Sequence, residues 1–361
     1  MIKVLHVITS LYTGGAERLL VNLLPLLRDS GNQVDLLLFN GIETPFKKEL
    51  LQKGIKVYSL SMKNDVYNPC NLYRVWWFLK KHRYDIIHTH NTACQLFVPL
   101  SQISIRTESK LVTTEHSSFN RRRSMWWIKP LDKWMYNRYA SIVCIGDKSY
   151  RNLSTYIGKS DSLITISNGV DTGSFIRPIK QILPGQQIVI TMVAALRVEK
   201  DHRTVLKAML HLPDNYRLQF IGSGPQEHVT SVKCLCSELG LDDRVTFMGV
   251  RQDVSDILEQ SDVVVLSSHW EGLSLSSIEG MASGRPFVAS DVDGLREMVG
   301  GSGVLFEHGN DKDLAEKIQW LCEHPDEYRK VAQRCQEKAR QYDISITAEK
   351  YLDLYHQVLN S

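Results

Sequence analysis

The sequence predicts an α/β protein made of two Rossmann-like domains, each built on a parallel sheet. Short apolar runs alternate with helix-compatible stretches along the whole chain, as in doubly wound folds. The length of 361 residues exceeds one typical domain of about 100–200 residues. The segment 167–187 is rich in Gly, Pro and Ser and separates two series of apolar runs. These three observations together support the fold class.

The expected strands are almost entirely apolar, which is typical of parallel sheets that helices cover on both faces. In chain order they are KVLHVIT, QVDLLLF, KVYSL, DIIHTH, KLVTTEH and SIVCIG in the first half, then QIVITMVAAL, RLQFIG, RVTFMG, DVVVLSS and RPFVAS in the second. We place the first domain at residues 1–172 and the second at 173–343, and we expect a last helix at 344–361 to pack back on the first domain. With the domains facing each other across a cleft, ligands are expected at the carboxyl ends of the strands.

The composition is that of a soluble globular protein, with 43% apolar and 23% charged residues, and it excludes a disordered or collagenous chain. No apolar run reaches the roughly 18 residues that a membrane-spanning helix needs. The first residues lack the apolar core and cleavage site of a signal peptide. The seven cysteines form no CxxC pair, so we expect reduced thiols and a cytoplasmic protein.

The two halves of the chain differ in charge. Residues 1–177 carry 24 Lys and Arg against 13 Asp and Glu, whereas residues 178–361 carry 19 against 27. The basic half is expected to face an anionic partner, and residues 119–138, which combine cations with three tryptophans, favour an anionic membrane surface. The alternative is a helix packed through its tryptophans with its cations in water. We expect no nucleic-acid partner, because no nucleic-acid motif is present.

Two glycines, Gly14 and Gly15, follow the first expected strand and open a leucine-rich helix. Glycine lets a phosphate approach the backbone, and the free N–H groups at the helix N-terminus attract it. Neither GxGxxG nor GxxxxGK[ST] occurs, so a dinucleotide oxidoreductase and a P-loop NTPase both lose support. By itself the glycine pair is also compatible with an ordinary βα turn.

A loop that carries two functional groups follows the buried strand ending at Ser268. The loop 271–274 reads Glu-Gly-Leu-Ser, and a helix is expected to begin near Leu275 and to contain Glu279. Loop amides can bind phosphate or sugar oxygens, and a carboxylate accepts hydrogen bonds from pairs of hydroxyls. Sugars and riboses offer such hydroxyl pairs.

Glu271 and Glu279 form an E-x7-E pattern, and Met-Ala-Ser-Gly-Arg-Pro follows at 281–286. Here the sequence resembles the retaining glycosyltransferases of family 4, which have the GT-B fold of two Rossmann-like domains. Further matching segments occur in order along the chain, at 14–17 (GGAE), 85–90 (DIIHTH), 115–116 (EH), 167–171 (SNGVD) and 222–225 (GSGP). The resemblance implies that the first domain binds an acceptor and the second a nucleotide-sugar donor.

The resemblance also implies roles for single residues. Glu271 would hold hydroxyls of the transferred sugar, Glu279 would hold the ribose hydroxyls, and His116 would bond the transferred sugar. The remaining donor-binding residues implied are Gly15, Gly222, Gly272, Leu273, Ser274 and Leu275. Of these, Gly15 would approach the diphosphate from the facing domain.

The departing diphosphate needs fixed positive charge, because its oxygens gain negative charge in the transition state. Arg197 and Lys200, just after the first strand of the second domain, supply two cations and resemble the Arg/Lys pair of the family. The family arginine precedes the lysine by five residues, where this chain has Ala195. We assign Lys200 as catalytic and expect Arg197 to reach the site from the next part of the loop.

His88 and His90 alternate on one strand and point to the same side, as a zinc-binding pair would, but the spacing shows no third ligand. The family resemblance places this strand end near the acceptor, so both are assigned acceptor contacts, with packing as the alternative for His88. Asp291-Val292-Asp293 imitates the metal-binding DxD of the other major glycosyltransferase fold. We expect no metal and no cofactor, since the nucleotide sugar is a substrate.

We therefore expect a retaining hexosyltransferase that moves a sugar from a nucleotide-sugar donor to a lipid-linked or polysaccharide acceptor. Its products would be cell-surface glycans such as lipopolysaccharide or capsule, and it would act in the cytoplasm or bound peripherally to the inner face of the membrane. Two alternatives remain: a GT-B nucleotide-sugar epimerase, and a catalytically silent glycosyltransferase-like binding subunit.

Overall fold

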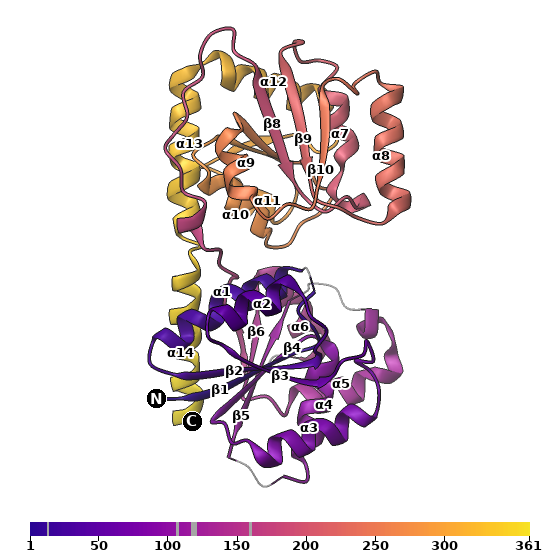
Figure 1. Ribbon diagram of the computed structural model, residues 1–361, viewed down its shortest axis with the longest axis vertical. Coiled ribbons are helices and arrows are strands. Elements are labelled where there is room, and N and C mark those ends of the chain that lie inside the picture. The colour runs from indigo at the N-terminus through magenta and orange to yellow at the C-terminus, as the bar shows by residue number, and fades with distance from the viewer. Residues whose placement is uncertain (13, 106–107, 117–120, 159–160) are drawn as a thin grey trace. The chain divides into compact units, whose positions relative to one another are not determined.

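The computed structural model describes residues 1–361 except 13, 106–107, 117–120 and 159–160 (Figure 1). The chain folds into two compact units. Unit 1 comprises Met1–Gly169 together with Ile344–Ser361, and unit 2 comprises Val170–Asp343. The C-terminal segment therefore belongs to the unit that the N-terminal half forms.

Unit 1 is built, in its described residues, on a seven-stranded parallel sheet in the order β3-β2-β1-β4-β5-β6-β7. The strands are β1 Lys3–Ile8, β2 Gln33–Asn40, β3 Lys56–Ser61, β4 Ile86–His90, β5 Lys110–Glu115, β6 Ser141–Cys144 and β7 Leu163–Thr165. The central strands β1, β4 and β5 are buried almost throughout, because helices cover both faces of the sheet. The strand order reverses between β1 and β4, and sheets of this kind bind ligands at the carboxyl ends beside that switch point.

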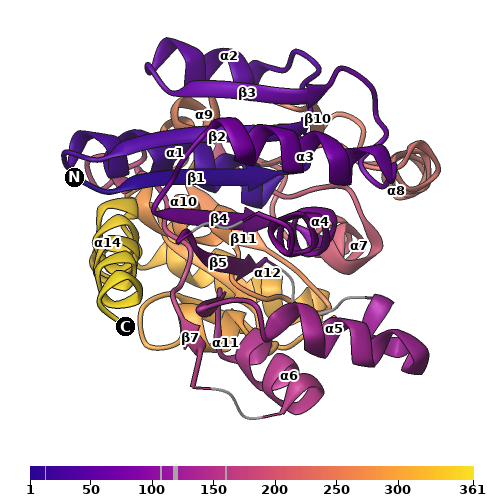
Figure 2. The ribbon, with the colours of Figure 1, turned by 90° about the horizontal axis from the view of Figure 1, so that it is seen from below.

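The helices of unit 1 divide between the two faces of its sheet (Figure 2). One face is covered by α1 Gly15–Asp29, α2 Pro45–Gln52 and α14 Ile344–Asn360, and the other by α3 Cys70–Lys81, α4 Thr92–Gln102, α5 Lys129–Tyr136 and α6 Asp147–Ile157. Two short 3-10 helices, η1 Arg121–Ser124 and η2 Trp126–Ile128, precede α5. This division follows from right-handed crossovers between parallel strands.

Helix α14 contributes buried aromatic side chains to unit 1. Tyr351 and Tyr355 have no exposed surface and pack in the same core as Leu20 and Leu24 of α1. Their hydroxyls require hydrogen-bond partners in the interior, because a buried hydroxyl without one is costly. Those partners lie on β4 and β5.

Unit 2, all of whose residues are described, has a six-stranded parallel sheet in the order β10-β9-β8-β11-β12-β13. The strands are β8 Ile188–Val193, β9 Tyr216–Ile221, β10 Val245–Gly249, β11 Val263–Leu266, β12 Phe287–Ser290 and β13 Val304–Phe306. Its helices are η3 Thr172–Ser174, η4 Val198–Lys200, α7 His202–Ala208, α8 Gln226–Glu238, α9 Val254–Gln260, α10 Leu275–Ala282, α11 Leu295–Val299, α12 Asp311–Glu323 and α13 Pro325–Arg340. The switch point of this sheet lies between β8 and β11.

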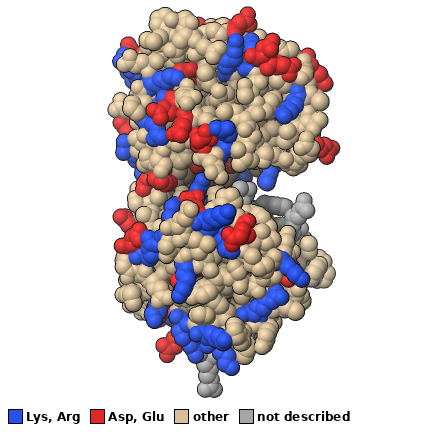
Figure 3. All heavy atoms as spheres, in the orientation of Figure 1, with Lys and Arg blue, Asp and Glu red and all other residues tan. Residues whose placement is uncertain are grey.

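Two Rossmann-like units with parallel sheets confirm the predicted α/β fold class. Each of the seven cysteines is free, as expected for reduced thiols. No helix within the described ranges is both long enough and apolar enough to cross a membrane. On the face shown in Figure 3, Lys and Arg side chains spread over unit 1, whereas Asp and Glu are more frequent over unit 2.

Candidate functional site

The carboxyl ends of β8 and β9 lie against each other in unit 2 through two glycines. A Cβ on Gly222 would stand 2.0 Å from the carbonyl oxygen of Ala194, and one on Gly224 would stand 1.8 Å from that of Leu196. The Leu196 amide donates to the Ser223 carbonyl at 3.0 Å. Any side chain at these glycines would push the loop after β8, which carries Lys200, away from the sheet. Gly222 therefore supports the site through backbone packing.

Lys200 and Glu271 meet at the switch point of unit 2. The Lys200 ammonium donates to Glu271 Oε2, and their side chains are only 17% and 12% exposed. The Ser268 hydroxyl donates to the same oxygen at 3.2 Å. A charge pair so poorly exposed is weakly screened by water, so the carboxylate fixes the position of the ammonium, which can donate its remaining N–H groups to a phosphate.

The loop after β11 is positioned by two neighbours that the sequence analysis did not assign. Gly294 has φ +86, and a Cβ there would stand 2.5 Å from the Glu271 carbonyl oxygen and 2.7 Å from that of Gly272. Only glycine combines this conformation with this approach. Asp201, at φ 28, accepts from the Ser267 hydroxyl at 3.0 Å and caps α7. The sequence contains a signal for each residue, because Gly294 directly precedes α11 and Asp201 directly precedes α7.

The loop leads into α10, which begins at Leu275. Ser274 caps the helix, because its side chain accepts from the Ser277 amide. Leu273 is partly buried against the core, and Gly272 is exposed. Glu279 is half-buried within α10.

The Arg197 side chain pairs with a different acid from Lys200. It is 62% exposed, and its guanidinium pairs with Glu199 at 3.9 Å. The Arg197 backbone nevertheless shapes the loop, because its carbonyl accepts from the Lys200 amide at 3.0 Å. Asp291 and Asp293, the DxD look-alike, both pair with Arg296, at 2.6 and 3.5 Å.

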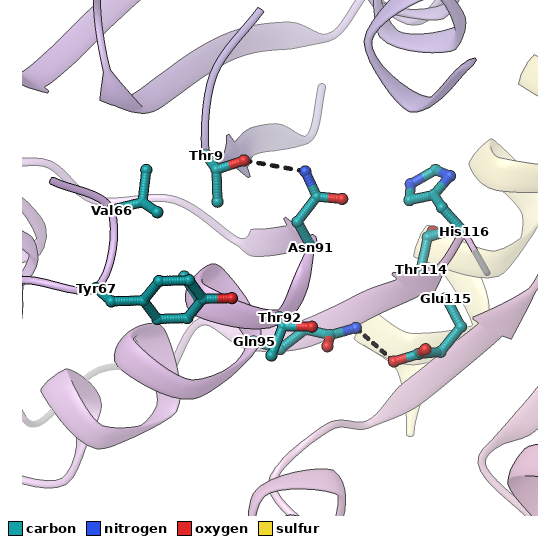
Figure 4. A pocket seen from close by; sticks show the side chains of 10 residues that line it. Thr9, Val66, Tyr67, Asn91, Thr92, Gln95, Thr114, Glu115 and His116 are labelled. Carbon is teal, nitrogen blue, oxygen red and sulfur yellow. Dashed lines mark hydrogen bonds between the residues drawn. The ribbon is translucent and has the colours of Figure 1, made fainter. Parts of the chain in front are cut away.

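Unit 1 has a cavity of about 260 Å³ at the carboxyl ends of its central strands (Figure 4). Asn91, at φ 68, follows β4 and donates to the Thr9 hydroxyl at 3.1 Å, which links the two sides of the switch point. Gln95 donates to Glu115 at 2.7 Å in the cavity wall. The lining residues are Thr9, Val66, Tyr67, Asn91, Thr92, Ala93, Gln95, Thr114, Glu115 and His116.

The predicted histidines of unit 1 are not equivalent. His116 lines this cavity, whereas His88 and His90 have no exposed surface and are hydrogen bonded to other side chains at both ring nitrogens. Neither His88 nor His90 presents a ring nitrogen to an acceptor in this structure, because burial and these bonds occupy both. His6 of β1 stacks on both, and the sequence analysis missed it because it lies 82 residues before His88.

Two groups of described residues could hold a metal ion. His6, His88 and His90 form one, and Asp201, His269 and His308 form the other, with the ligand atoms of each within 4.8 Å of one another. In the first group, His6 is the third imidazole that the spacing of His88 and His90 in the sequence did not reveal. The expectation of no metal stays a prediction.

The glycine turn of unit 1 begins α1 as expected. Gly14 is the N-cap and Gly15 the first helical residue, and no side chain caps this terminus. The Glu17 carboxylate lies over Gly14, since a Cβ there would stand 2.3 Å from Glu17 Oε2. Burial raises the pKa of Glu17 above its usual value. In the first turn of α1, Gly15 is thus exposed, but the Glu17 carboxyl group lies next to it over Gly14.

The basic aromatic segment 119–138 departs in part from the expectations for it. Arg122 pairs with Asp132 at 3.0 Å and Arg123 with Glu115 at 2.6 Å, and both carboxylates are buried. The tryptophans at 126 and 127 are instead 85% and 64% exposed. The expectation that these arginines are solvated cations is therefore wrong, because they neutralise acids in the interior. Residues 119 and 120 and the side chain of residue 121 lie outside the described part.

The comparisons with known proteins agree with this architecture. The family model Glycosyltransferase Family 4 matches residues 13–174, and Glycosyl transferases group 1 matches residues 176–342. A protein of Bacillus subtilis strain 168 named "Putative glycosyltransferase EpsD" is 28% identical over 325 residues, which are 82% of this chain and 84% of that protein.

Two further likenesses are informative. The UDP-Gal:alpha-D-GlcNAc-diphosphoundecaprenol alpha-1,3-galactosyltransferase of Escherichia coli is 27% identical over 256 residues, 65% of this chain and 64% of that protein. The crystal structure of Anabaena Alr3699/HepE in complex with UDP has a TM-score of 0.84 at 21% identity and covers 98% of this chain and 100% of that one. With the two family models covering the two units in turn, this chain is a glycosyltransferase with the GT-B fold, of the family 4 type.

Proposed function

We propose that this glycosyltransferase moves a sugar from a nucleotide-sugar donor, bound by unit 2, to a lipid-linked acceptor in the synthesis of a cell-surface glycan, with retention of the anomeric configuration. The observation that carries the proposal is the poorly exposed Lys200 and Glu271 pair at the switch point of unit 2. The E. coli relative is named for a UDP-Gal donor and a diphosphoundecaprenol acceptor, and the solved relative is bound to UDP.

The pair explains how unit 2 would handle a nucleotide sugar. Lys200 places one positive charge where the leaving diphosphate gains negative charge, and this interaction strengthens as the glycosidic bond to phosphate breaks. Glu271 holds the ammonium in place and offers its second carboxylate oxygen to sugar hydroxyls. Glu279, within α10, is assigned the ribose hydroxyls, and the amides of 272–275 the phosphate and sugar oxygens. Arg197 is assigned no step, because its side chain is directed to solvent.

Retention is compatible with attack on the same face from which the diphosphate leaves. The acceptor hydroxyl forms the new bond to the anomeric carbon, and its proton passes to a leaving phosphate oxygen. No protein base is needed for that transfer, so none is assigned. The acceptor is assigned to the unit 1 cavity, whose hydroxyl, amide and imidazole groups suit a sugar. His116, which lines this cavity, keeps its assignment to an oxygen of the transferred sugar.

A donor screen followed by a transfer assay tests the proposal. Among common nucleotide sugars, one should raise the melting temperature of the protein, because a ligand at about 100 times its Kd adds roughly 2.7 kcal/mol of stability. That donor should then be consumed with a polyprenyl-diphosphate-linked sugar as acceptor, and NMR of the product should show the anomeric configuration of the donor. A product with the opposite anomeric configuration would refute retention. A donor whose sugar is epimerised, with no transfer to the acceptor, would refute the transferase reaction.

Matched lysine variants test whether the reaction depends on Lys200 of unit 2. Lys200→Met should lower kcat strongly with little change in fold, because its charge acts mainly as the diphosphate departs. Lys207→Met, which removes an exposed lysine of α7 in the same unit, should leave kcat unchanged. Equal kcat values for the two variants would remove Lys200 from the reaction.

We also propose that unit 1 binds an anionic membrane through aromatic and basic side chains. Trp77 on α3 and Trp126 and Trp127 of η2 are exposed, and α3 and α5 cover the same face of the sheet (Figure 2). Exposed cations accompany them: Lys80, Lys81, Lys129, Lys133 and Arg138. Indole rings favour the headgroup region, and lysines attract anionic lipid.

Tryptophan variants test this surface without disturbing the buried ion pairs. The double change Trp126→Ser and Trp127→Ser should weaken sedimentation with vesicles that contain anionic lipid, and added salt should weaken that of the natural protein. Trp320→Ser, which removes a 43% exposed tryptophan of α12 in unit 2, should not. Equal binding to neutral and anionic vesicles, or equal binding by both variants, would refute the membrane surface.

A further inference from the structure

One aromatic ring at the unit 1 cavity has no role in the proposed function. Tyr67 belongs to the loop between β3 and α3, lines the cavity and is 66% exposed. Tyr73 and Trp77 of α3 are exposed as well, but they do not line it. Among the described residues, Tyr67 is the one exposed aromatic side chain in the cavity wall. Figure 4 shows its ring reaching from the loop toward Asn91.

The loop that carries Tyr67 is a fixed turn. The Asn68 amide donates to the Asp65 carbonyl at 2.9 Å, which places Val66 and Tyr67 at the two central positions of the turn. Val66 is partly buried against the core of unit 1. The Asn71 side chain has no exposed surface and donates to the carbonyls of Asp65 and Val66 at 2.9 and 3.2 Å. The turn is thus fastened to the first turn of α3, and Tyr67 is exposed on a backbone that is held in place.

The buried side chains of the cavity wall are bonded to the interior. Glu115 accepts from Gln95 at 2.7 Å and from Tyr136 at 2.6 Å. The Thr114 hydroxyl is bonded to two other buried side chains. A ligand that used these groups would have to replace bonds that the fold already makes, at a cost in stability. We therefore expect recognition to depend on the less buried side chains of the wall.

Asn91 and Thr9 are such side chains, and both are only partly buried. The Asn91 carboxamide donates one hydrogen bond, to the Thr9 hydroxyl at 3.1 Å. The side-chain oxygen of Asn91 and the hydroxyl proton of Thr9 have no partner among the described residues. A carboxamide and a hydroxyl both accept and donate, so the two can bond hydroxyl groups of a ligand.

The size of the cavity favours a single small ring. Its volume of about 260 Å³ lies just below the roughly 300–1,000 Å³ of pockets that hold drug-sized ligands. A pyranose carries hydroxyls around its edge and C–H groups on its faces. The face of an aromatic ring is negative and attracts such C–H groups, and stacking also removes apolar area from water. An exposed ring beside a carboxamide and a hydroxyl matches both parts of a pyranose.

We propose that Tyr67 is a stacking platform for one pyranose ring of the acceptor, and that Asn91 and Thr9 bond hydroxyls at the edge of that ring. The inference rests on the proposed function, which assigns the acceptor to this cavity, and it names the side chain that recognises its sugar. His116 lies on the other side of the cavity from Tyr67 (Figure 4), and its assignment to the transferred sugar is unchanged. An open-chain polyol has the same hydroxyls but no apolar face, so it is disfavoured.

Binding of simple sugars tests the platform without donor or lipid. The probes are the methyl pyranosides of glucose, galactose, mannose and N-acetylglucosamine, measured by saturation-transfer NMR on the full-length protein. We expect at least one pyranoside to receive saturation, most strongly at the ring C–H protons of one face, and sorbitol to receive none. Tyr67→Ser should remove most of this signal, and Tyr67→Phe, which keeps the ring, should retain it. Absence of binding by every pyranoside, or equal binding by Tyr67→Ser, would overturn the proposal.

Tyr73 provides a matched control, because it is also 66% exposed in unit 1 but lies on α3 outside the cavity wall. Tyr73→Ser should bind the pyranosides as the natural protein does. Equal losses in Tyr73→Ser and Tyr67→Ser would overturn the proposal. A loss in Tyr67→Phe as large as that in Tyr67→Ser would show that the hydroxyl makes the contact, and this would refute stacking.

The transfer assay tests the same ring with the whole acceptor. Tyr67→Ser should raise the KM for the acceptor about 10-fold, which corresponds to about 1.4 kcal/mol. The kcat and the KM for the donor should change little, because stacking is equally strong in the ground state and the transition state. Tyr67→Phe and Tyr73→Ser should keep the natural KM. A lower kcat of Tyr67→Ser with an unchanged acceptor KM would overturn the platform.

The two measurements separate this inference from the proposed function. If pyranosides bind in a manner that depends on Tyr67 but no sugar is transferred, the proposed function fails and the sugar platform stands. If sugar is transferred and Tyr67→Ser keeps the natural acceptor KM, the platform fails and the proposed function stands. Weaker sedimentation of Tyr67→Ser with anionic vesicles, together with unchanged pyranoside binding, would assign the ring to the membrane surface and overturn the proposal.

Discussion

Lowering the pH from 6.5 to 5 should destabilise unit 1 far more than unit 2. Burial lowers the pKa of His6 to about 3 and that of His116 to about 4, whereas an unfolded histidine titrates at about 6.5. Between these values the unfolded chain binds protons that the native fold excludes, so the free energy of unfolding falls as the pH falls. The effect should be absent well above pH 6.5 and should level off below the folded pKa values.

The size of the effect follows from the pKa differences. Each of these two histidines should cost about 1.6 kcal/mol between pH 6.5 and 5, since one unit of differential protonation is worth about 1.4 kcal/mol. His88 and His90, with pKa values also lowered well below the usual range by burial, add to the loss in unit 1 in the same direction. In unit 2 burial lowers the pKa of His202 to about 4, for a loss of about 1.6 kcal/mol. Since domains are stable by about 5–15 kcal/mol, unit 1 should lose a substantial part of its stability by pH 5.

Hydrogen exchange read by mass spectrometry measures both units in one sample. Peptides from β1, β4 and β5 should lose protection at pH 5 relative to pH 6.5, after correction for the intrinsic exchange rate, and peptides from β8 and β11 should lose much less. His356→Asn, at an exposed position of α14, should leave the difference unchanged. Equal loss in the two units would show that the pKa values of His6, His88, His90 and His116 are not lowered in the folded protein.

Three further predictions concern single side chains. Arg123→Met should lower the stability of unit 1 by about 3–5 kcal/mol in urea unfolding, because its buried carboxylate partner loses its counter-ion, whereas Arg138→Met at the surface should change it by less than about 0.5 kcal/mol. Glu271→Gln should lower kcat in the transfer assay while Lys200 is retained, and an unchanged kcat would remove the carboxylate charge from the site. Gly294→Ala should weaken nucleotide-sugar binding measured by calorimetry, since the added Cβ would displace the loop 271–274. Gly309→Ala should not weaken it, because Gly309 has a similar φ of +77 but no neighbouring atoms.

The fold class could be predicted from sequence because it depends on local pattern. Strands such as 262–268 and 286–290 read as continuous apolar runs, and only parallel sheets covered on both faces bury such runs fully. The structure places β11 and β12 within those two segments. The order of motifs along the chain likewise indicated a GT-B glycosyltransferase, which the two family models support.

The candidate site in unit 2 was predictable in part. The loop 271–274 and Lys200 lie at strand ends, and strand ends of one parallel sheet meet at one edge, so their proximity follows from the predicted topology. The direction of the Arg197 side chain does not follow from the topology, because a single rotation of the backbone in a loop decides whether a long side chain faces the site or the solvent. Gly294 was also not assigned, since its role depends on the carbonyl groups of another loop.

The basic aromatic segment shows where composition fails. Counting cations and tryptophans in 119–138 predicted exposed arginines, whereas Arg122 and Arg123 neutralise Asp132 and Glu115, and the indoles at 126 and 127 face solvent. Sequence distance to these acids gives no sign of the pairing. A buried carboxylate draws its counter-ion from whichever cation the fold brings within reach.

By itself the sequence determined the parallel sheets, the strand-end loops and the family type, because these depend on the residue types within short stretches of chain. Only the tertiary structure decided that His6, His88 and His90 share one stack and that Tyr355, 267 residues after His88, lies at hydrogen-bond distance from it. Strand register and the docking of α14 bring these side chains together. Once buried, they lose water as a partner, so their charge and their tautomers depend on one another instead of on the neighbouring sequence.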